Sequence, residues 1–384
     1  MNVLSRTEDS LPANWYFDEG QYARELDAVW YRDWVCVGRQ EDVPSTGDFV
    51  QVEIGNQKLI VTRDGNRKLR VFHNTCRHRG SILCTDSRGR FRNGRIICPY
   101  HTWTYDLDGA LVATPARLDC DDFDASRFSL YAVNVAEWGG FIFVNLADAP
   151  DVSIEEFLGA EGRLLERWPL RDMVSVQQDR CVLACNWKLF WENYSECYHC
   201  PRIHPELCKL VPVYKSGVLS YADTPGWQAD HPGESGRPRV APGIETWTPD
   251  GKSRLPHFPG LAEADIDAGV TFASFTASMF IVAHPDYVRS VRILPQGPES
   301  CELVVDWLLL PGTAEQHAGQ MEDLFAVGRM LVEQDGRVCE LNQAGLKSLR
   351  HSRGVLVPQE YSLYEFHEWL RERLSARGGN NCQE

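Results

Sequence analysis

The sequence has no long apolar run. Its best stretch, Leu303–Leu310, is short and is interrupted by Asp306, whereas a transmembrane helix needs roughly 20 consecutive apolar residues. Residues 1–15 carry Arg6 and Glu8 and have no continuous apolar core, so no signal peptide is evident. We therefore expect no membrane partner and a cytoplasmic location.

Basic charge and nucleotide-binding motifs are also scarce. The 39 lysines and arginines are outnumbered by 54 aspartates and glutamates, which leaves a net charge of −15. This balance argues against nucleic acid or an anionic membrane as the main partner, because both attract cationic surfaces. No G-x-G-x-x-G motif lies between a predicted strand and a predicted helix, so the sequence indicates no nicotinamide or flavin site.

The chain does have length, ordinary hydrophobic content and many cysteines. Its 384 residues exceed a typical single core, so we expect two domains. Hydrophobic residues make up 43% of the sequence, which is typical of a globular protein and excludes general disorder. In a cytoplasmic protein, the thirteen cysteines are predicted to be thiols or metal ligands rather than disulfides.

The first part of the chain combines one helix with a strand-rich module. Residues 18–35 have apolar side chains at spacings of three and four, which predicts an amphipathic helix. From Gly47 the period changes to two, and Gly-Asn and Asp-Gly pairs mark turns. The predicted strands are 49–54, 58–62, 68–73, a hairpin at 103–112, and one or two strands in 131–146. We expect an N-terminal helical segment (1–39) that packs on the C-terminal domain, followed by a small β domain (40–150).

The C-terminal domain, 151–384, mixes helices with longer strands. A segment at 214–262 is rich in Gly, Pro and polar residues, and a connection of that length is usually functional or partly mobile. The predicted helices are 153–168, 185–205, 314–348 and 359–374, and the predicted strands are 173–184, 271–283, 287–294 and 301–310. The expected fold class is α+β.

Two pairs of metal-binding residue types flank a gap of nineteen residues: Cys76 with His78, and Cys98 with His101. Two thiolates and two imidazoles suit either zinc or an iron–sulfur cluster. Zinc fingers usually pair Cys with Cys and His with His, whereas each segment here supplies one of each. That division suits two loops that each present a thiolate to one iron and an imidazole to the other. A structural zinc site and four unrelated core residues are the alternatives.

The segments NTCRHRGSILC and CPYHTWTYDLDG resemble the Rieske family. By this resemblance, Cys76 and Cys98 bind one iron of a [2Fe–2S] cluster, and His78 and His101 bind the other. The gap between the two pairs is slightly longer than in many members, which implies a longer turn around residues 87–93.

A second candidate site lies in CNWKLFWENYSECYHCPRIHP, residues 185–205. Helical spacing places Glu196 and His199 on one face of one helix. His204 is five residues further along, and the neighbouring prolines indicate a bend or an end that would let it swing back toward His199. Two imidazoles and a carboxylate would complete the facial triad of a non-haem Fe(II) site.

The third ligand of such a triad would be a carboxylate at a position where the surrounding pattern predicts an apolar residue. Asp335 falls on the apolar stripe of the helix predicted at 314–348, where an unpaired carboxylate would be costly without a cation. Asp335 could instead cap Gly336 or pair with Arg329 or Arg337. Two histidines in one helix are, by themselves, more often surface residues or satisfied by other partners.

The chain resembles the α subunit of Rieske-type non-haem iron oxygenases over nearly its whole length. The resemblance is carried by the motifs NWK, EN, E-x-YH and H in this order, followed late in the chain by E-x-D-x₄-E. The resemblance implies that His199, His204 and Asp335 bind a mononuclear iron. It also implies that Glu196 takes the place of a bridging carboxylate, which is Asp in many ring-hydroxylating members. Glu196 would then link His101 of a neighbouring subunit to His199.

The resemblance further implies the architecture, cofactors and partners. It implies an N-terminal antiparallel β Rieske domain, a C-terminal helix-grip (START-like) catalytic domain, a [2Fe–2S] cluster, Fe(II) and a homotrimer. Such a mono- or dioxygenase uses O₂ to attack a C–H bond or an aromatic ring. Because the chain shows no dinucleotide site, a separate NAD(P)H-dependent flavin or iron–sulfur reductase must supply the electrons.

The stretch ENYSECYHC, with Glu at the bridging position, is more similar to oxygenases of quaternary ammonium compounds than to naphthalene-type dioxygenases. Those enzymes, of glycine betaine, carnitine, stachydrine and choline type, hydroxylate an N-methyl group or a neighbouring carbon, and N-demethylation releases formaldehyde. A methylammonium group favours an aromatic cage. The candidates in the second domain are Trp227, Trp247, Phe272, Phe275, Phe280 and Tyr287. Ring hydroxylation of an aromatic acid or amine is the alternative function.

Overall fold

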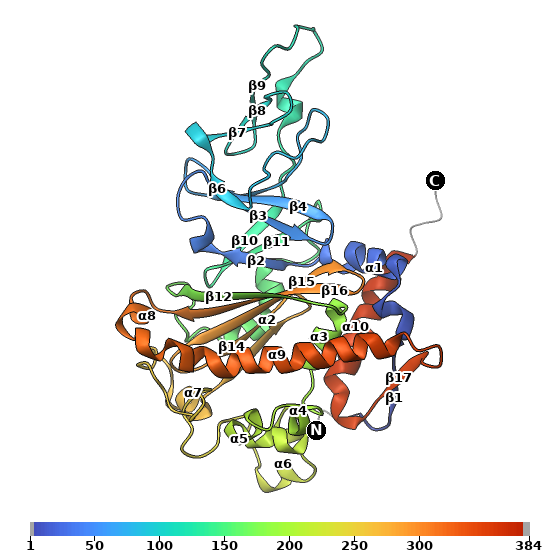
Figure 1. Ribbon diagram of the computed structural model, residues 1–384, viewed down its shortest axis with the longest axis vertical. Helices are drawn as coiled ribbons and strands as arrows, with labels where there is room; N and C mark the ends of the chain where they lie inside the picture. The colour runs from blue at the N-terminus through green and yellow to red at the C-terminus, as the bar shows by residue number, and fades with distance from the viewer. Residues whose placement is uncertain (1–3, 379–384) are drawn as a thin grey trace. The chain divides into compact units, whose positions relative to one another are not determined.

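The computed structural model describes residues 4–378, which form two compact units (Figure 1). The small unit spans Val29–Phe157, and the large unit combines the two ends of the chain. The boundaries expected at 40 and 150 both fall inside the small unit. One reason is that strand β2 (Val35–Arg39) pairs with β11 (Phe141–Asn145) of the same unit.

The small unit consists of three antiparallel sheets. The predicted strands near residues 49, 58 and 68 form consecutive neighbours of one sheet, and the predicted Asp-Gly turn joins β8 (Thr104–Asp106) to β9 (Leu111–Ala113). The sheets have the orders β5 (Leu69–His73)-β4 (Gln57–Arg63)-β3 (Asp48–Ile54)-β6 (Arg88–Arg90), β7 (Arg95–Ile97)-β8 (Thr104–Asp106)-β9 (Leu111–Ala113), and β10 (Asn134–Trp138)-β11-β2.

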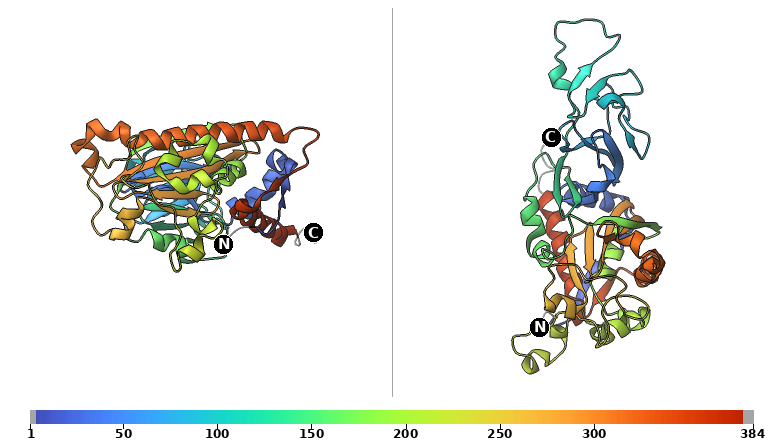
Figure 2. Two further views of the ribbon diagram at one scale, coloured as in Figure 1. Left: turned by 90° about the horizontal axis from the view of Figure 1, so that it is seen from below. Right: turned by 90° about the vertical axis from the view of Figure 1, so that its left-hand side faces the viewer.

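The large unit is built on a five-stranded antiparallel sheet. Its order is β12 (Val174–Leu183)-β16 (Ser300–Leu309)-β15 (Val288–Gly297)-β14 (Met279–Ala283)-β13 (Thr271–Phe275). The long helix α9 (Met321–Leu346) lies across one face of this sheet (Figures 1 and 2). Gly336 allows the close approach, because a Cβ there would lie 2.9 Å from the Leu183 side chain. These features confirm the α+β fold class.

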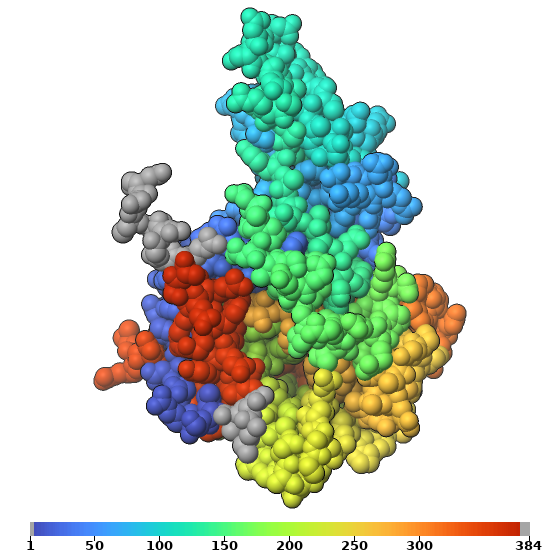
Figure 3. All heavy atoms as spheres, turned by 180° about the vertical axis from the view of Figure 1, so that it is seen from behind, coloured from blue at the N-terminus to red at the C-terminus, as the bar shows by residue number. Residues whose placement is uncertain are grey.

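The N-terminal residues 4–28 belong to the large unit. Strand β1 (Glu8–Pro12) pairs with β17 (Arg353–Leu356), and Figure 3 shows the blue N-terminal segment beside the red C-terminal helix α10 (Tyr361–Gly378). Helix α1 (Glu19–Glu25) continues as a π-helical turn (Leu26–Trp30). The helix predicted over 18–35 therefore ends earlier, because the chain enters β2 at Val35.

The remaining helices are short, apart from α2 (Ile154–Leu164) and α3 (Trp187–Tyr194). Among the described residues, none of the helices combines the length and the apolar character that crossing a membrane requires. The other helical elements are η1 (Ala13–Tyr16), η3 (Gln40–Asp42), η4 (Arg92–Gly94), η5 (Ala125–Phe128), α4 (Cys200–Ile203), α5 (Leu207–Leu210), η6 (Pro212–Ser216), η7 (Tyr221–Asp223), α6 (Trp227–Asp230), α7 (Glu263–Ala268), α8 (Thr313–Gln316), η8 (Ala318–Gln320) and η9 (Pro358–Glu360).

Candidate metal centres

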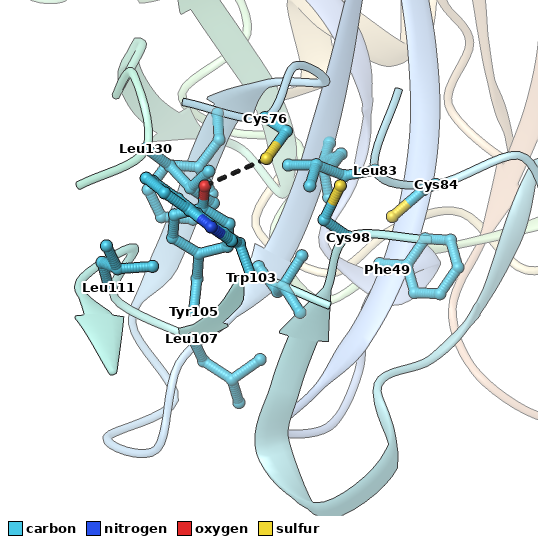
Figure 4. Close-up of a cluster of buried hydrophobic side chains, with 13 residues drawn as sticks. Phe49, Cys76, Leu83, Cys84, Cys98, Trp103, Tyr105, Leu107, Leu111 and Leu130 are labelled. Atoms are coloured by element: carbon cyan, nitrogen blue, oxygen red, sulfur yellow. Dashed lines mark hydrogen bonds between the residues drawn. The ribbon is translucent and has the colours of Figure 1, made fainter. Parts of the chain in front are cut away.

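Two tight loops of the small unit present the first set of candidate ligands. Cys76 N donates to Ser81 O, and Cys98 N donates to Trp103 O, so each loop closes on itself within six residues. Gly80, at φ +74°, supplies the left-handed residue that the first loop needs. Cys76 and Cys98 are 3% and 1% exposed, and their sulfur atoms lie near each other in the core of the unit (Figure 4).

The two imidazoles lie at the outer end of these loops. His78 and His101 are exposed and half-buried, and their Nδ1 atoms are 3.2 Å apart. The indole of Trp103 stacks on His78 with the ring centroids 4.8 Å apart. Two neighbouring thiols beneath two imidazoles whose Nδ1 atoms face each other fit a cluster with one Cys₂ iron and one His₂ iron.

Tyr105 supports the first loop from below. Its hydroxyl oxygen lies 3.2 Å from Cys76 Sγ and accepts a hydrogen bond from the backbone N–H of Arg77 at 3.1 Å (Figure 4). Burial raises the pKa of the Cys76 thiol, so without a metal the sulfur would remain protonated. A bound cation would favour the thiolate instead.

The second set of candidate ligands lies in the large unit. His199 and His204 flank the short helix α4 as its N-cap and C-cap, and Asp335 projects from α9. Asp335 Oδ1 lies 2.7 Å from His204 Nε2 and 3.5 Å from His199 Nε2, and the two Nε2 atoms are 3.2 Å apart. One ligand atom from each residue falls within 4.8 Å of the others, which fits a single metal ion.

The Nδ1 atom of each imidazole in this set has its own partner. Glu196 Oε1 lies 2.5 Å from His199 Nδ1, and Gln334 Oε1 lies 2.7 Å from His204 Nδ1. Because both partners are acceptors, each ring is held with its Nδ1–H hydrogen bonded and its Nε2 directed at the other ligands of the set, where a metal ion would take the place of a proton. Gln334 was not predicted from the sequence, although it directly precedes Asp335.

Electrostatics in this triad favour a cation. Burial raises the pKa of Asp335, but hydrogen bonds from His199 and His204 outweigh it, so the net pKa is lowered. Burial lowers the pKa of His199, yet Asp335 and Glu196 raise it to about 9. The alternative pairing of Asp335 with Arg329 is not present, since Arg329 binds Asp179 and Glu322.

Two predictions for this segment were wrong. Glu196 and His199 do not share one helix, because α3 ends at Tyr194. The Glu196 carboxylate accepts hydrogen bonds from the backbone N–H groups of Tyr198 and His199, and such local bonds compete with helix continuation. The resulting turn still brings Glu196 against His199.

The second wrong prediction concerns the cysteines. We expected no disulfides, but Cys197 and Cys200 form one. The tight turn between α3 and α4 places their Cα atoms 4.9 Å apart, which is within disulfide range. The other cysteines among residues 4–378 are free thiols.

A cavity of about 530 Å³ opens beside the triad. It is lined by one face of β13–β15, by α3, α9 and α10, and by residues between α5 and α7. Trp247, Phe272 and Phe280 of the six candidate cage residues line it, whereas Trp227, Phe275 and Tyr287 do not. Other lining side chains that were not singled out from the sequence are Asn193, Tyr214, Arg289, Phe366 and Trp369.

Comparison with known proteins assigns both units. Residues 33–124 match the Rieske [2Fe–2S] domain, and residues 170–376 match the catalytic domain of the ring-hydroxylating α subunit. The second match alone spans more than half of the 384 residues.

Similar proteins cover nearly the whole chain. The glycine betaine monooxygenase oxygenase subunit of Chromohalobacter salexigens is 29% identical, over 96% of this chain and 87% of its own length. The chloroplastic choline monooxygenase of Beta vulgaris is 29% identical over 96% and 78%. The solved structure of a quaternary ammonium Rieske monooxygenase has a TM-score of 0.73 at 19% identity and covers 96% of both chains.

The metal chemistry follows from these matches and from the donor sets. The small unit carries the Rieske domain, and the His-His-Asp set of the large unit is typical of mononuclear iron in such oxygenases. Enzymes of this kind act with a reductase and O₂. The chain therefore belongs to the family of ring-hydroxylating α subunits and is the oxygenase component of a Rieske non-haem iron oxygenase.

Proposed function

We propose that this oxygenase hydroxylates an N-methyl group of a small quaternary ammonium compound, which then loses formaldehyde. The observation that carries the proposal is the opening of the His199, His204 and Asp335 triad into a cavity lined by aromatic side chains. The faces of aromatic rings attract methylammonium groups. The similarity to enzymes named for glycine betaine and choline, over almost the whole chain, supports the same substrate class.

The residues take the following roles in this proposal. Cys76, His78, Cys98 and His101 hold the cluster, and His199, His204 and Asp335 hold the mononuclear iron. When bound, the cluster supplies electrons and the iron activates O₂ for attack on a C–H bond.

The chain itself orients the donors and the substrate. Glu196 and Gln334 keep the Nε2 atoms of His199 and His204 directed at the iron. The stacked rings of Tyr194 and Phe280, with centroids 3.6 Å apart, form a rigid part of the cavity wall. Apolar lining also excludes bulk water from the reacting methyl group.

The overall reaction is balanced with two electrons from the reductase. The substrate R–N(CH₃)₃⁺, O₂, two electrons and two protons give R–N(CH₃)₂CH₂OH⁺ and water. The carbinolamine then breaks its C–N bond to give R–N(CH₃)₂, formaldehyde and a proton. Formaldehyde therefore reports N-demethylation directly.

Electron delivery is proposed to cross between subunits of a homotrimer. Electrons would pass from His101 of one subunit through Glu196 of the next to His199. The second contact of this path is already present, because Glu196 Oε1 lies 2.5 Å from His199 Nδ1. Inter-subunit electron transfer is described for the quaternary ammonium Rieske monooxygenase of similar fold, which supports the same route here.

A substrate screen with a surrogate NAD(P)H-dependent reductase tests the proposed function. We expect formaldehyde and a demethylated product, identified by mass spectrometry, from glycine betaine, carnitine or choline. Product without formaldehyde would indicate oxidation at a neighbouring carbon. A hydroxylated ring from benzoate or aniline, with no product from any ammonium compound, would contradict the proposal and favour ring hydroxylation.

A further inference from the structure

Arg289 is a buried cation without a counter-ion in the wall of the cavity. It projects from β15 and is 6% exposed. Its Nε and Nη1 atoms have no hydrogen-bond partner, and among residues 4–378 it forms no salt bridge. A guanidinium carries five N–H donors and stays charged in proteins, so several donors are free to meet a ligand.

Packing, rather than ion pairing, holds the Arg289 side chain in place. Its Nη1 atom lies against α9, where a Cβ at Gly328 would be only 2.6 Å away. The guanidinium carbon lies 5.8 Å from the ring centroid of Trp247, which also lines the cavity. The glycine thus provides a slot for the guanidinium, although glycine lowers helix propensity in the middle of α9.

The same strand shows how a buried arginine is normally neutralised. Arg292, 4% exposed, has its Nη2 atom 3.0 Å from Asp306, and residues 289 and 292 face opposite sides of the sheet. The Asp335 carboxylate acts on Arg289 through space, but His204 and His199 already engage it. An unpaired buried charge is costly, so the cavity is complementary to an anionic group on the ligand.

We infer that Arg289 binds a carboxylate of the substrate, through the two-pronged hydrogen bonding that a guanidinium offers. This rests on the proposed function for the ammonium half of the substrate and adds the acidic half. The preferred substrate is then a zwitterion with a trimethylammonium group and a carboxylate, as in betaines. Choline carries the cation but an alcohol in place of the carboxylate, and it leaves Arg289 unpaired.

Three probe ligands separate the two halves of the substrate. Glycine betaine carries both charges, choline carries only the cation, and 3,3-dimethylbutanoate, in which a carbon atom replaces the quaternary nitrogen of glycine betaine, carries only the carboxylate. Binding of each is measured by calorimetry on the anaerobic iron-loaded protein, for the unmodified chain and for Arg289→Met and Arg289→Lys. Arg180→Met, an exposed arginine on the same sheet and outside this cavity, is the matched control.

We expect Arg289→Met to weaken glycine betaine and 3,3-dimethylbutanoate by about 100-fold, because a buried charge pair loses one partner. The affinity of Arg289→Met for choline should be within about 2-fold of that of the unmodified chain. Arg289→Lys should bind glycine betaine more tightly than Arg289→Met does, because lysine keeps the positive charge but cannot form the bidentate hydrogen bonds of a guanidinium. Arg180→Met should match the unmodified chain. Equal glycine betaine affinity in the unmodified chain and Arg289→Met would overturn the inference.

Thermal unfolding distinguishes ligand binding from a structural role. Without ligand, Arg289→Met should unfold at the same or a higher temperature, because it removes an uncompensated charge. Arg292→Met should unfold at a lower temperature, because it leaves the buried Asp306 carboxylate without its cation. A marked destabilisation of ligand-free Arg289→Met would contradict an anchoring role.

Turnover and binding of the unmodified chain and of Arg289→Met together separate this inference from the proposed function. If the unmodified chain and Arg289→Met demethylate glycine betaine equally well, the role of Arg289 as a carboxylate anchor is refuted and the proposed function stands. If only benzoate binds, and binds more weakly to Arg289→Met, the anchor stands and the ammonium substrate is refuted.

Discussion

At the residue scale, the amide of Gln334 holds the ring of His204, a candidate iron ligand, by a hydrogen bond. Its Oε1 atom accepts the Nδ1–H of His204, which is only 2% exposed. We expect Gln334→Leu to weaken Fe(II) binding by about 10- to 100-fold, the usual cost of losing such a partner. Fe(II) titration with metal analysis measures the effect, and the visible spectrum of the cluster should not change.

Glu333→Ala is the matched control for Gln334→Leu, because Glu333 is the exposed preceding residue on α9. Its iron affinity should equal that of the unmodified chain. If Gln334→Leu binds iron as tightly as this control, the hydrogen bond does not orient His204.

Glu196 is the second residue whose role can be tested alone. In Glu196→Gln the one remaining side-chain oxygen can still accept the Nδ1–H of His199, at the expense of the backbone N–H groups of Tyr198 and His199, so both metals should remain bound. Loss of the negative charge at His199 should lower product formation on the order of 10- to 100-fold. Single-turnover experiments on the reduced protein measure it, and unchanged single-turnover and steady-state rates would refute the bridging role.

The candidate residues of the two donor sets could be picked out from the sequence, but the residues that hold them in place could not. The cluster residues follow each other at short spacing, and Asp335 stands out on an apolar stripe. Gln334 and Arg289 carry no such signal, because a glutamine on a helix and an arginine in a strand are ordinary until tertiary packing shows what they face. Their roles depend on contacts between elements far apart in the sequence.

At the element scale, helix α3 is tied to the N-terminal segment through a buried ion pair. Lys188 and Glu25 are both 0% exposed, with Nζ 2.7 Å from Oε2. The Glu25 carboxylate also accepts from the Trp187 indole and the Gln21 amide. The helix leads directly into the turn that holds Glu196 and His199, so this anchor positions the iron site.

Breaking this pair should destabilise the large unit strongly. Lys188→Met leaves the Glu25 carboxylate buried without a cation, at a cost of about 3–5 kcal/mol in unfolding free energy. Glu25→Gln combined with Lys188→Met removes both charges and should lose less than Lys188→Met alone. Urea unfolding of Lys188→Met, Glu25→Gln and the double variant, each compared with the unmodified chain, completes the double-mutant cycle. A double variant as unstable as the sum of the single variants would show that the two charges do not interact.

Element boundaries were less predictable than element types. Alternation and turn residues predicted the strands β3, β4 and β5 well. The end of α3 at Tyr194 was missed, because apolar spacing continues through Cys197 and Tyr198 while the Glu196 carboxylate diverts the backbone. Periodicity reports which face is buried, but it does not report where a side chain competes for backbone hydrogen bonds.

At the scale of the whole molecule, each unit carries the full set of candidate ligands for one metal centre. Cys76, His78, Cys98 and His101 all lie in the small unit, whereas the His-His-Asp triad lies entirely in the large unit. Loss of one centre should therefore leave the other in place. This independence allows the proposed electron path between subunits to be tested by complementation.

Two chains, each lacking one centre, should restore each other's activity if electrons cross between subunits. Cys98→Ser should lose the cluster and keep the mononuclear iron, whereas Asp335→Ala should lose the mononuclear iron and keep the cluster. Each variant alone should be inactive. Co-expression with two different affinity tags and sequential purification yields mixed oligomers, in which a cluster of one chain can serve the iron of its neighbour.

We expect the mixed oligomers to regain a substantial fraction of the unmodified activity, measured as product per mononuclear iron. The control is Cys98→Ser co-expressed with a chain that carries both Cys98→Ser and Asp335→Ala, which has no cluster anywhere and should stay inactive. Mixed oligomers that contain both metals yet show no more activity than this control would place electron transfer within a single chain. Failure to isolate any doubly tagged species would contradict the homotrimer itself, because an oligomer of identical chains must form from both variants.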